Sequence, residues 1–313
     1  MNASAKSSSV ATARTYPTGD AADWIRRYTP EIESMEELRR VENAVMTFAI
    51  VGYRTPEDIV ECAERCRSQA AALGGPVEVL VVDNTGLEPV IDRLRQKVDR
   101  LVRLKRNVGL CPARNLAAAL ARTELVAFVD DDGWLEPGWG HAAREVLQVS
   151  EVLAVRGRIV FKNHPWYSAT PKHYDLGRRP VDDLLSTEGN CVVRREEFLA
   201  AGGFAHELMG GEGLDLVWRW RKLYPGRVVR YEPTMVMRHD YYNSWDKMRA
   251  KTLRYVQNSV VLVAEESEID RYNRKFLARR KVGLPSLSID QWVARYVLRL
   301  AQEWIRLTAR TQR

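Results

Sequence analysis

Three consecutive aspartates, Asp130, Asp131 and Asp132, directly follow the apolar run 125–129. A run that is apolar at every position is typical of a strand buried on both faces of a helix-covered sheet. Open α/β sheets bind ligands at the carboxyl ends of their strands, and three adjacent carboxylates there repel one another unless a cation lies between them. Alternation along a strand puts Asp130 and Asp132 on one side, with Asp131 pointing away. This D-x-D pair suits Mg²⁺ or Mn²⁺; the alternative is a loop in which one aspartate caps the next helix.

A second acidic segment is Glu212 and Asp215, which lie in the glycine-rich sequence GGEGLD. The glycines around Glu212 permit a close backbone approach or a positive φ, which favours a functional loop. Asp215 precedes an amphipathic helix predicted over residues 216–223. It therefore fits an N-cap as well as a catalytic carboxylate.

Two further side chains extend this polar set. His239 follows a strand predicted over residues 228–238, where neutral imidazole could be a third metal ligand, although a lone histidine is more often an ordinary hydrogen-bonded residue. Arg114 lies in the first turns of an alanine-rich helix at residues 112–122. The helix dipole disfavours a cation there unless an anion is near, and helix N-termini bind phosphate groups. An arginine extended over the surface is equally common.

These side chains need a parallel sheet to position them, and the pattern of the chain predicts one. Strand, helix, strand, helix and strand alternate from residue 44 to residue 104, which indicates right-handed crossovers and a doubly wound sheet. A helix outside the core is predicted over residues 21–40, and a long irregular region over residues 162–188. The predicted strands are 44–53, 77–83, 100–104, 125–129, 153–161, 191–193 and 228–238, and the main helices between them are 56–73, 88–98 and 134–148.

Composition narrows the class of protein. The 313 residues carry a formal charge of +7, which suits anionic ligands such as phosphates or acidic membranes and does not require nucleic acid. The four cysteines form no CxxC pair and no cluster with histidine, which argues for a reducing compartment and against structural zinc. No N-terminal apolar segment and no apolar run near 18 residues occurs, so we expect a cytoplasmic protein.

The C-terminal residues 289–313 predict an amphipathic helix. Packing of its apolar stripe against the core or a second copy of the chain is the default expectation. Contact with an anionic membrane is the alternative. The stripe comprises Trp292, Val293, Tyr296, Val297, Leu300, Trp304 and Leu307.

Assembled in order, these motifs resemble the GT-A glycosyltransferases, and within them glycosyltransferase family 2. The resemblance covers roughly residues 44–260 and rests on IVGYRTPE, VVDNTG, RNVGLCPARN, FVDDDG, GNCVVRREEFLAAGGF, EGLDLVWRWRK and RHD. It implies a Rossmann-like, mostly parallel sheet flanked by helices, with a C-terminal helical extension. The implied divisions are residues 1–43 (tail and helix), 44–133 (nucleotide-binding half), 134–260 (acceptor half) and 261–313 (extension).

The resemblance also implies roles for individual residues. Asp83 would contact the nucleotide base, and Asp130 and Asp132 would hold a divalent cation, with His239 at a position that is a metal ligand in some relatives. Inversion at the anomeric carbon is the implied stereochemistry. The residues implied for the donor site are Val51, Tyr53, Arg54, Asp83, Arg106, Asn107, Arg114 and Asp131.

Two positions depart from the family pattern. Many relatives have asparagine where Arg54 stands. The usual E-D-x-D-L, whose first aspartate is the general base, is here Glu212-Gly213-Leu214-Asp215-Leu216, so glycine occupies the base position. We therefore expect Glu212, and after it Asp215, to act as the base, unless the acceptor needs no protein carboxylate.

The sequence thus predicts a metal-assisted transfer of a sugar from a UDP- or dTDP-linked donor. The acceptor, whether glycan, lipid-linked molecule, peptide or small molecule, is not specified by it. A nucleotidyltransferase is a rival, but it would usually open with a glycine-rich phosphate loop and a lysine. A non-catalytic sugar-nucleotide-binding protein is the other rival.

Overall fold

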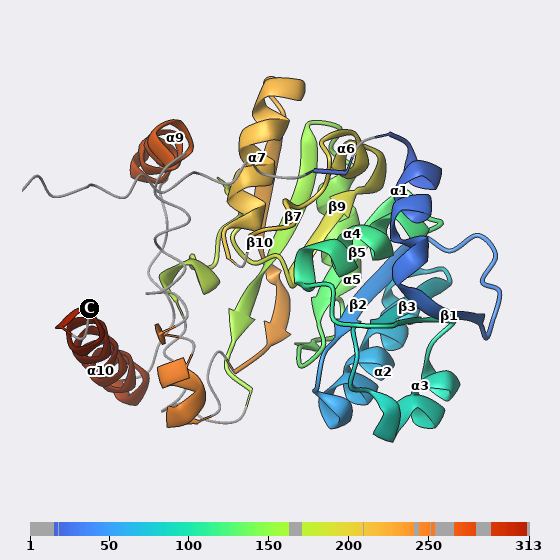
Figure 1. The fold of residues 1–313 in the computed structure, drawn as a ribbon. Coiled ribbons are helices and arrows are strands. Elements are labelled where there is room, and N and C mark those ends of the chain that lie inside the picture. The colour runs from blue at the N-terminus through green and yellow to red at the C-terminus, as the bar shows by residue number, and fades with distance from the viewer. Residues whose placement is uncertain are drawn as a thin grey trace, which may run out of the picture.

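The computed structural model describes residues 16–17, 19–162, 171–208, 210–240, 244–250, 252–253, 266–279 and 289–311. A ten-stranded mixed sheet forms the centre, in the order β1-β4-β3-β2-β5-β9-β7-β10-β6, with β8 paired to β10 (Figure 1). The strands are β1 (Ile32–Glu37), β2 (Met46–Gly52), β3 (Val77–Asp83), β4 (Arg100–Leu104), β5 (Leu125–Asp130), β6 (Trp134–Leu135), β7 (Val152–Val160), β8 (Val181–Asp183), β9 (Asn190–Arg194) and β10 (Val228–Arg238).

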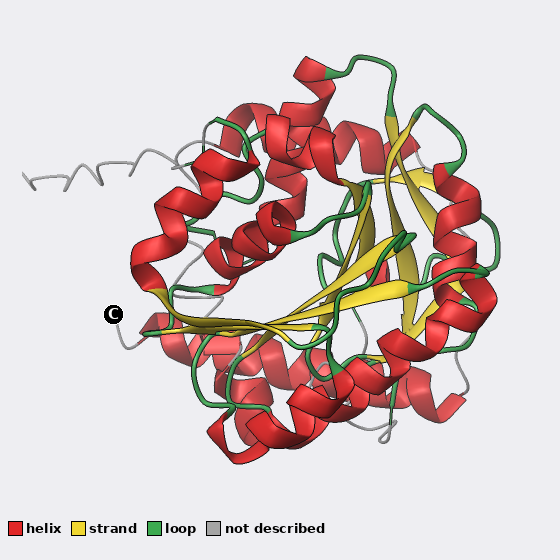
Figure 2. Ribbon diagram, turned by 90° about the vertical axis from the view of Figure 1, so that its right-hand side faces the viewer, coloured by secondary structure: helices red, strands yellow, loops and turns green. Residues whose placement is uncertain are grey.

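Helices lie on both sides of this sheet (Figure 2). One core packs the sheet against the helices α2, α3 and α5, and the other packs it against α1, α4, α6 and α7. The helices of the main body are α1 (Ala21–Tyr28), α2 (Pro56–Leu73), α3 (Ile91–Lys97), α4 (Leu110–Leu120), α5 (Trp139–Leu147), α6 (Arg195–Ala200) and α7 (Glu212–Leu223).

The strands β2 to β5 are parallel, as the alternating pattern predicted. β2 pairs in parallel with both β3 and β5, and β3 pairs in parallel with β4. The chain therefore builds outward from β2 to β4 and then crosses back to place β5 on the other side of β2. Such a reversal of strand order leaves a crevice at the carboxyl ends of the two strands, where α/β sheets bind ligands. In the register, Val51 lies opposite Asp130 and Gly52 opposite Asp83, so these residues share that edge.

The expected helix over residues 21–40 is wrong beyond Tyr28. α1 ends there, a 3-10 turn covers Thr29–Glu31, and β1 then joins the sheet antiparallel to β4. The segment is also not outside the core, since Trp24 and Tyr28 are buried against α4 and its neighbours. The sheet thus begins before residue 44.

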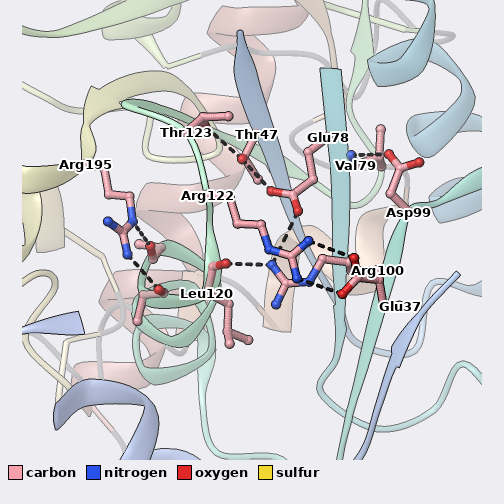
Figure 3. A network of polar contacts seen from close by, with 12 residues as sticks. Glu37, Thr47, Glu78, Val79, Asp99, Arg100, Leu120, Arg122, Thr123 and Arg195 are labelled. Carbon is pink, nitrogen blue, oxygen red and sulfur yellow. Dashed lines mark hydrogen bonds and ion pairs between the residues drawn. The ribbon is translucent and has the colours of Figure 1, made fainter. Parts of the chain in front are cut away.

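The opposite edge of the parallel strands is held by a buried polar network (Figure 3). The Thr47 hydroxyl on β2 donates to Glu78 on β3 at 2.7 Å, and Arg100 on β4 reaches the same carboxylate at 3.4 Å. Arg100 also donates to the Leu120 carbonyl at the end of α4 at 2.6 Å. Because Glu78 and Arg100 are both almost fully buried, each depends on the other for compensation of its charge.

Later elements follow the predictions with shifted ends. The region 162–188 contains a 3-10 turn at Lys172–Tyr174 and β8, while residues 163–170 lie outside the described part. Residues 245–250 and 252–253 are helical.

Two helices form the C-terminal extension. α9 (Glu266–Arg279) lies against α7, with the rings of Trp218 and Tyr272 5.7 Å apart. α10 (Ile289–Thr311) confirms the predicted amphipathic helix, but the side chains it buries, against Met248, are Leu298 and Ile305. The expectation that the apolar stripe packs on the core is wrong, because these side chains are exposed: Trp292, Val293, Tyr296, Val297, Leu300, Trp304 and Leu307. None of the described helices combines the length and apolar character needed to cross a bilayer.

Candidate active site

Asp131 joins the two strands that flank the switch point. Its Oδ2 accepts a hydrogen bond from the Tyr53 N–H at 3.1 Å and a second one from the Thr55 hydroxyl. Asp131 therefore points toward the turn after β2. Because β5 ends at Asp130, strand alternation does not extend to Asp131 and Asp132. Burial, and after it the negative charge of Asp132, raises the pKa of Asp131 to about 7. α5 begins after Gly138, so the alternative in which one of the aspartates caps the next helix is wrong.

Asp130 is held by a buried arginine. Arg114 donates to Asp130 at 2.7 Å and to Glu212 at 3.3 Å, and its side chain is only 4% exposed. The interpretation of Arg114 as a surface arginine is therefore wrong. The anions that make a cation tolerable at the start of α4 are carboxylates from β5 and α7.

Asp132 and His239 come together at the end of β5 and β10. Asp132 Oδ1 lies 3.2 Å from His239 Nε2. The ammonium of Lys162 donates to the Asp132 carbonyl oxygen at 3.2 Å and to Asp58 at 2.7 Å, so a protein cation also balances charge here. Lys162 was not singled out from the sequence, where nothing distinguishes it from a surface lysine.

The residues fit a divalent cation in part. A carboxylate oxygen and an imidazole nitrogen at the same point are suitable donors, but Asp130 is turned to Arg114. Within the described residues no group of three or more histidine, cysteine, aspartate or glutamate side chains is arranged to hold a metal. Mg²⁺ and Mn²⁺ sites in nucleotide enzymes commonly use one or two protein ligands and complete the shell with phosphate oxygens and water. Asp132 and His239 would be the two protein ligands of such a site.

Asp83 offers an acceptor on the other side of β2. It is 1% exposed, and among the described residues its Oδ1 has no hydrogen-bond partner, while Oδ2 lies 3.4 Å from Arg103. Burial raises the pKa of Asp83 against the opposing effect of Arg103. A buried acceptor that lacks a donor at a ligand-binding edge is ready to take an N–H from a bound molecule.

Asn84 connects the loops after β3 and β4. Its amide nitrogen donates to Asn107 at 3.0 Å and to the Gly109 carbonyl at 3.2 Å, and its oxygen accepts from the Val108 N–H at 2.9 Å. Asn107 thus stabilises the conformation of the loop between β4 and α4 by accepting hydrogen bonds from Asn84 and from the Gly109 N–H. Arg106 pairs with Glu31 of the 3-10 turn and is largely exposed. The structure does not join Arg106 and Asn107 to the Arg114 cluster.

The turn after β2 carries Tyr53 and Arg54. Arg54 has φ of +60°, a conformation in which asparagine is favoured among residues with side chains. An asparagine would therefore suit this position. The guanidinium of Arg54 lies 5.0 Å from the centre of the Tyr53 ring. Val51, which precedes the turn on β2, is buried in the core.

Asp215 is not an N-cap, because α7 begins at Glu212 with Gly211 as its cap. The N-cap interpretation is therefore wrong. Asp215 lies one turn into the helix, where Arg219 donates to it at 2.8 Å and the Tyr16 hydroxyl at 3.2 Å. Both of its oxygens are engaged.

Glu188 is a carboxylate that the sequence did not single out. It precedes β9, and its Oε1 accepts a hydrogen bond from the Gly213 N–H at 2.9 Å. Burial, and after it the negative charge of Glu212, raises the pKa of Glu188 to about 8. Asp130 and Glu212 therefore pair with the guanidinium of Arg114, and the negative charge of Glu188 also acts on it.

Comparisons with known proteins agree with this arrangement. Residues 47–199 match the model of glycosyl transferase family 2. A pre-mycofactocin glycosyltransferase of Mycobacterium tuberculosis (strain CDC 1551 / Oshkosh) is 31% identical over 146 residues, which are 42% of this chain and 30% of that protein. A putative glycosyltransferase, EpsH, of Bacillus subtilis (strain 168) is 28% identical over 103 residues, which are 32% of this chain and 29% of that protein. The chain thus spans less than a third of the length of these curated relatives.

The fold also has a solved counterpart. A mannosyltransferase from Pyrobaculum calidifontis, solved in complex with GDP-Man and Mn²⁺, superposes with a TM-score of 0.52 at 18% identity, covering 93% of this chain and 79% of that one. At this identity the likeness shows the GT-A type of fold alone. The central region of the chain is therefore similar to glycosyltransferase family 2, and the chain has a fold of the GT-A type.

Proposed function

We propose that this protein transfers a sugar from a UDP- or dTDP-linked donor to an acceptor nucleophile, with inversion at the anomeric carbon. The observation that carries the proposal is the polar set on the two sides of β2. Among the described residues, Asp83 presents a buried oxygen without a hydrogen-bond partner at the end of β3, and Asp132 meets His239 just beyond the end of β5. Two strand spacings separate β3 from β5, about 10 Å, which a nucleoside diphosphate can bridge from base to phosphates.

The same region of the site contains groups that could neutralise the charge of the leaving nucleoside diphosphate. Asp132 and His239 would hold Mg²⁺ or Mn²⁺, and the bound ion would neutralise charge on the departing nucleoside diphosphate. Arg106 is an exposed basic side chain on the loop before α4. Its pairing with Glu31 is a surface ion pair that solvent screens, so Arg106 can exchange Glu31 for a diphosphate at little cost.

The exposed face of α10 and the state of the cysteines bear on where the acceptor is met. The exposed apolar stripe of α10 fits a peripheral membrane contact or a second copy of the chain. All four cysteines are free and buried, in keeping with a cytoplasmic reaction.

A thermal-shift screen tests the donor and the metal together. The probes are UDP-glucose, UDP-N-acetylglucosamine, dTDP-glucose and GDP-mannose, each with Mn²⁺ and with EDTA. A donor at about 100 times its Kd stabilises the folded chain by about 2.7 kcal/mol, which is a shift of several degrees. We expect a UDP- or dTDP-linked donor to give the largest shift with Mn²⁺.

Asp132→Ala is the matching variant, and Asp92→Ala, which alters an exposed acid on α3, is the control. Asp132→Ala should lose the part of the shift that depends on Mn²⁺, and Asp92→Ala should keep it. An unchanged shift in Asp132→Ala would contradict the metal assignment. Release of pyrophosphate instead of nucleoside diphosphate would point to a nucleotidyltransferase, and binding without turnover to a non-catalytic protein.

A further inference from the structure

Gly213, which stands where the family pattern has its general base, has no space for a side chain. A Cβ atom placed there would lie 2.2 Å from the Leu185 carbonyl oxygen and 2.7 Å from Glu188 Oε1. Real Cβ atoms do not approach other atoms below 3.0 Å, and the nearest obstacle is backbone, which cannot rotate away. A carboxylate at this point therefore cannot come from residue 213.

A carboxylate reaches the same point from another segment. Glu188 Oε1 accepts the Gly213 N–H at 2.9 Å; the residue keeps partial solvent exposure, although protein atoms enclose its carboxyl group. The segment that carries Glu188 is fixed by a turn in which the Asn190 N–H donates to the Thr187 carbonyl at 3.0 Å. Gly189 lies directly against Asp130, since the Asp130 N–H donates to the Gly189 carbonyl at 2.9 Å. Glu188 is thereby held between the D-x-D end of β5 and the first turn of α7.

The two carboxylates favoured from the sequence are already engaged. Glu212 accepts from Arg114 at 3.3 Å with one oxygen and from the Gly210 N–H at 2.8 Å with the other. Asp215 is occupied by Arg219 and by Tyr16. The Glu188 carboxylate, by contrast, accepts from only one other described residue, the Gly213 N–H at Oε1, which leaves Oε2 for a substrate hydroxyl.

We propose that Glu188 is the general base of the transfer, supplied from the segment before β9 in place of the side chain that Gly213 lacks. This inference rests on the proposed glycosyl transfer. The Glu188 carboxylate takes the proton of the acceptor hydroxyl while the acceptor oxygen forms its bond to the anomeric carbon. The bond from that carbon to the donor diphosphate breaks, and its electron pair leaves with the nucleoside diphosphate.

The electrostatic surroundings suit this role. The charged and titratable groups that interact electrostatically with Glu188 are Arg114, Arg156, Glu212, Cys111 and Cys191. Burial and Glu212 raise the pKa of Glu188 to about 8, and Arg114 opposes them. A base works best when its pKa lies near the working pH. The wild-type rate should therefore rise with pH toward about 8.

Glu188 also caps the first turn of α7, so the test must separate capping from catalysis. Glu188→Gln keeps an oxygen for the Gly213 N–H but cannot accept a proton. Glu188→Asp keeps the carboxylate at a shorter reach. Glu124→Gln, which alters an exposed acid paired with Arg194, is the control outside the site.

The experiment measures release of nucleoside diphosphate from the best-binding donor, with water as acceptor, between pH 6 and pH 9. We expect kcat of Glu188→Gln to fall by about 100-fold or more, with donor KM within about twofold of wild type and the rise toward pH 8 lost. Glu188→Asp should retain more activity than Glu188→Gln, and Glu124→Gln should match wild type. Melting temperatures of all four proteins identify any variant that fails to fold, in which case Glu188→Asp and the wild-type pH profile decide.

Two results overturn the inference, and they are distinguishable. If wild type turns over a donor and Glu188→Gln does so within about threefold, or keeps the same pH profile, Glu188 is only a cap. If wild type releases no nucleoside diphosphate from any donor in the screen, the proposed function fails and the base assignment fails with it.

Discussion

The stability of Glu188→Gln should depend on pH in a way that follows from the burial of one carboxyl group. The pKa of Glu188 is about 8 in the folded chain, against an ordinary value of 4.5. Because the folded-state pKa is the higher one, the stability that protonated Glu188 contributes is fully present below pH 4.5. It is lost as pH rises toward 8. Between pH 5 and pH 8 the wild-type protein should therefore lose about 3 kcal/mol relative to Glu188→Gln, since each pKa unit is worth 1.36 kcal/mol.

Thermal denaturation at steps between pH 5 and pH 9 measures this difference. A loss of about 3 kcal/mol corresponds to roughly 5 °C in a chain of this size. Glu188→Gln should melt close to wild type at pH 5 and several degrees above it at pH 8, because the amide stays neutral beside Glu212. A melting difference that is the same at pH 5 and pH 8 would refute the reasoning, because Glu188 would then have an ordinary pKa.

Two further variants test other parts of the molecule. Arg100→Met leaves the buried carboxylate of Glu78 without its cation, and chemical denaturation should show a loss of about 3 to 5 kcal/mol; a loss below 1 kcal/mol would mean that water reaches Glu78. Asn84→Ala removes the links to Val108 and Gly109, so we expect a stability loss of about 1 to 3 kcal/mol and a smaller thermal shift with UDP-glucose. An unchanged donor shift in a destabilised Asn84→Ala would show that the loop does not border the donor.

The parallel half of the fold was predictable because strands that are buried on both faces have apolar residues at nearly every position. β2 and β3 are apolar at nearly every position, and the structure buries every one of their residues. β1 was missed for the opposite reason. Its sequence IESMEE alternates between partly buried and exposed residues and is rich in helix formers, and its partner β4 lies more than 60 positions away. Tertiary pairing therefore overrode local propensity.

The site was predictable where its residues end strands, and not where it depends on contacts across the fold. Asp83 and Asp130 were located because they terminate buried strands. The spacing of the chain could not show that Arg114 would bind Asp130, or that Asp132 would meet His239 across 107 positions. Glu188 illustrates the same limit, because it lies 25 positions before Gly213 in a segment with no regular structure of its own.

The first strand has a consequence for how copies of the chain could associate. β1 pairs with the outer edge of β4. Its glutamates form ion pairs with arginines, Glu36 with Arg95 and Glu37 with Arg122. An outermost strand so charged is a poor template for pairing with a second sheet. The strand at the opposite edge of the sheet, β6, is only two residues long and is too short to pair with a strand of another molecule. Neither edge strand therefore favours edge-to-edge pairing of sheets from two molecules. Self-association would have to proceed through helical surfaces.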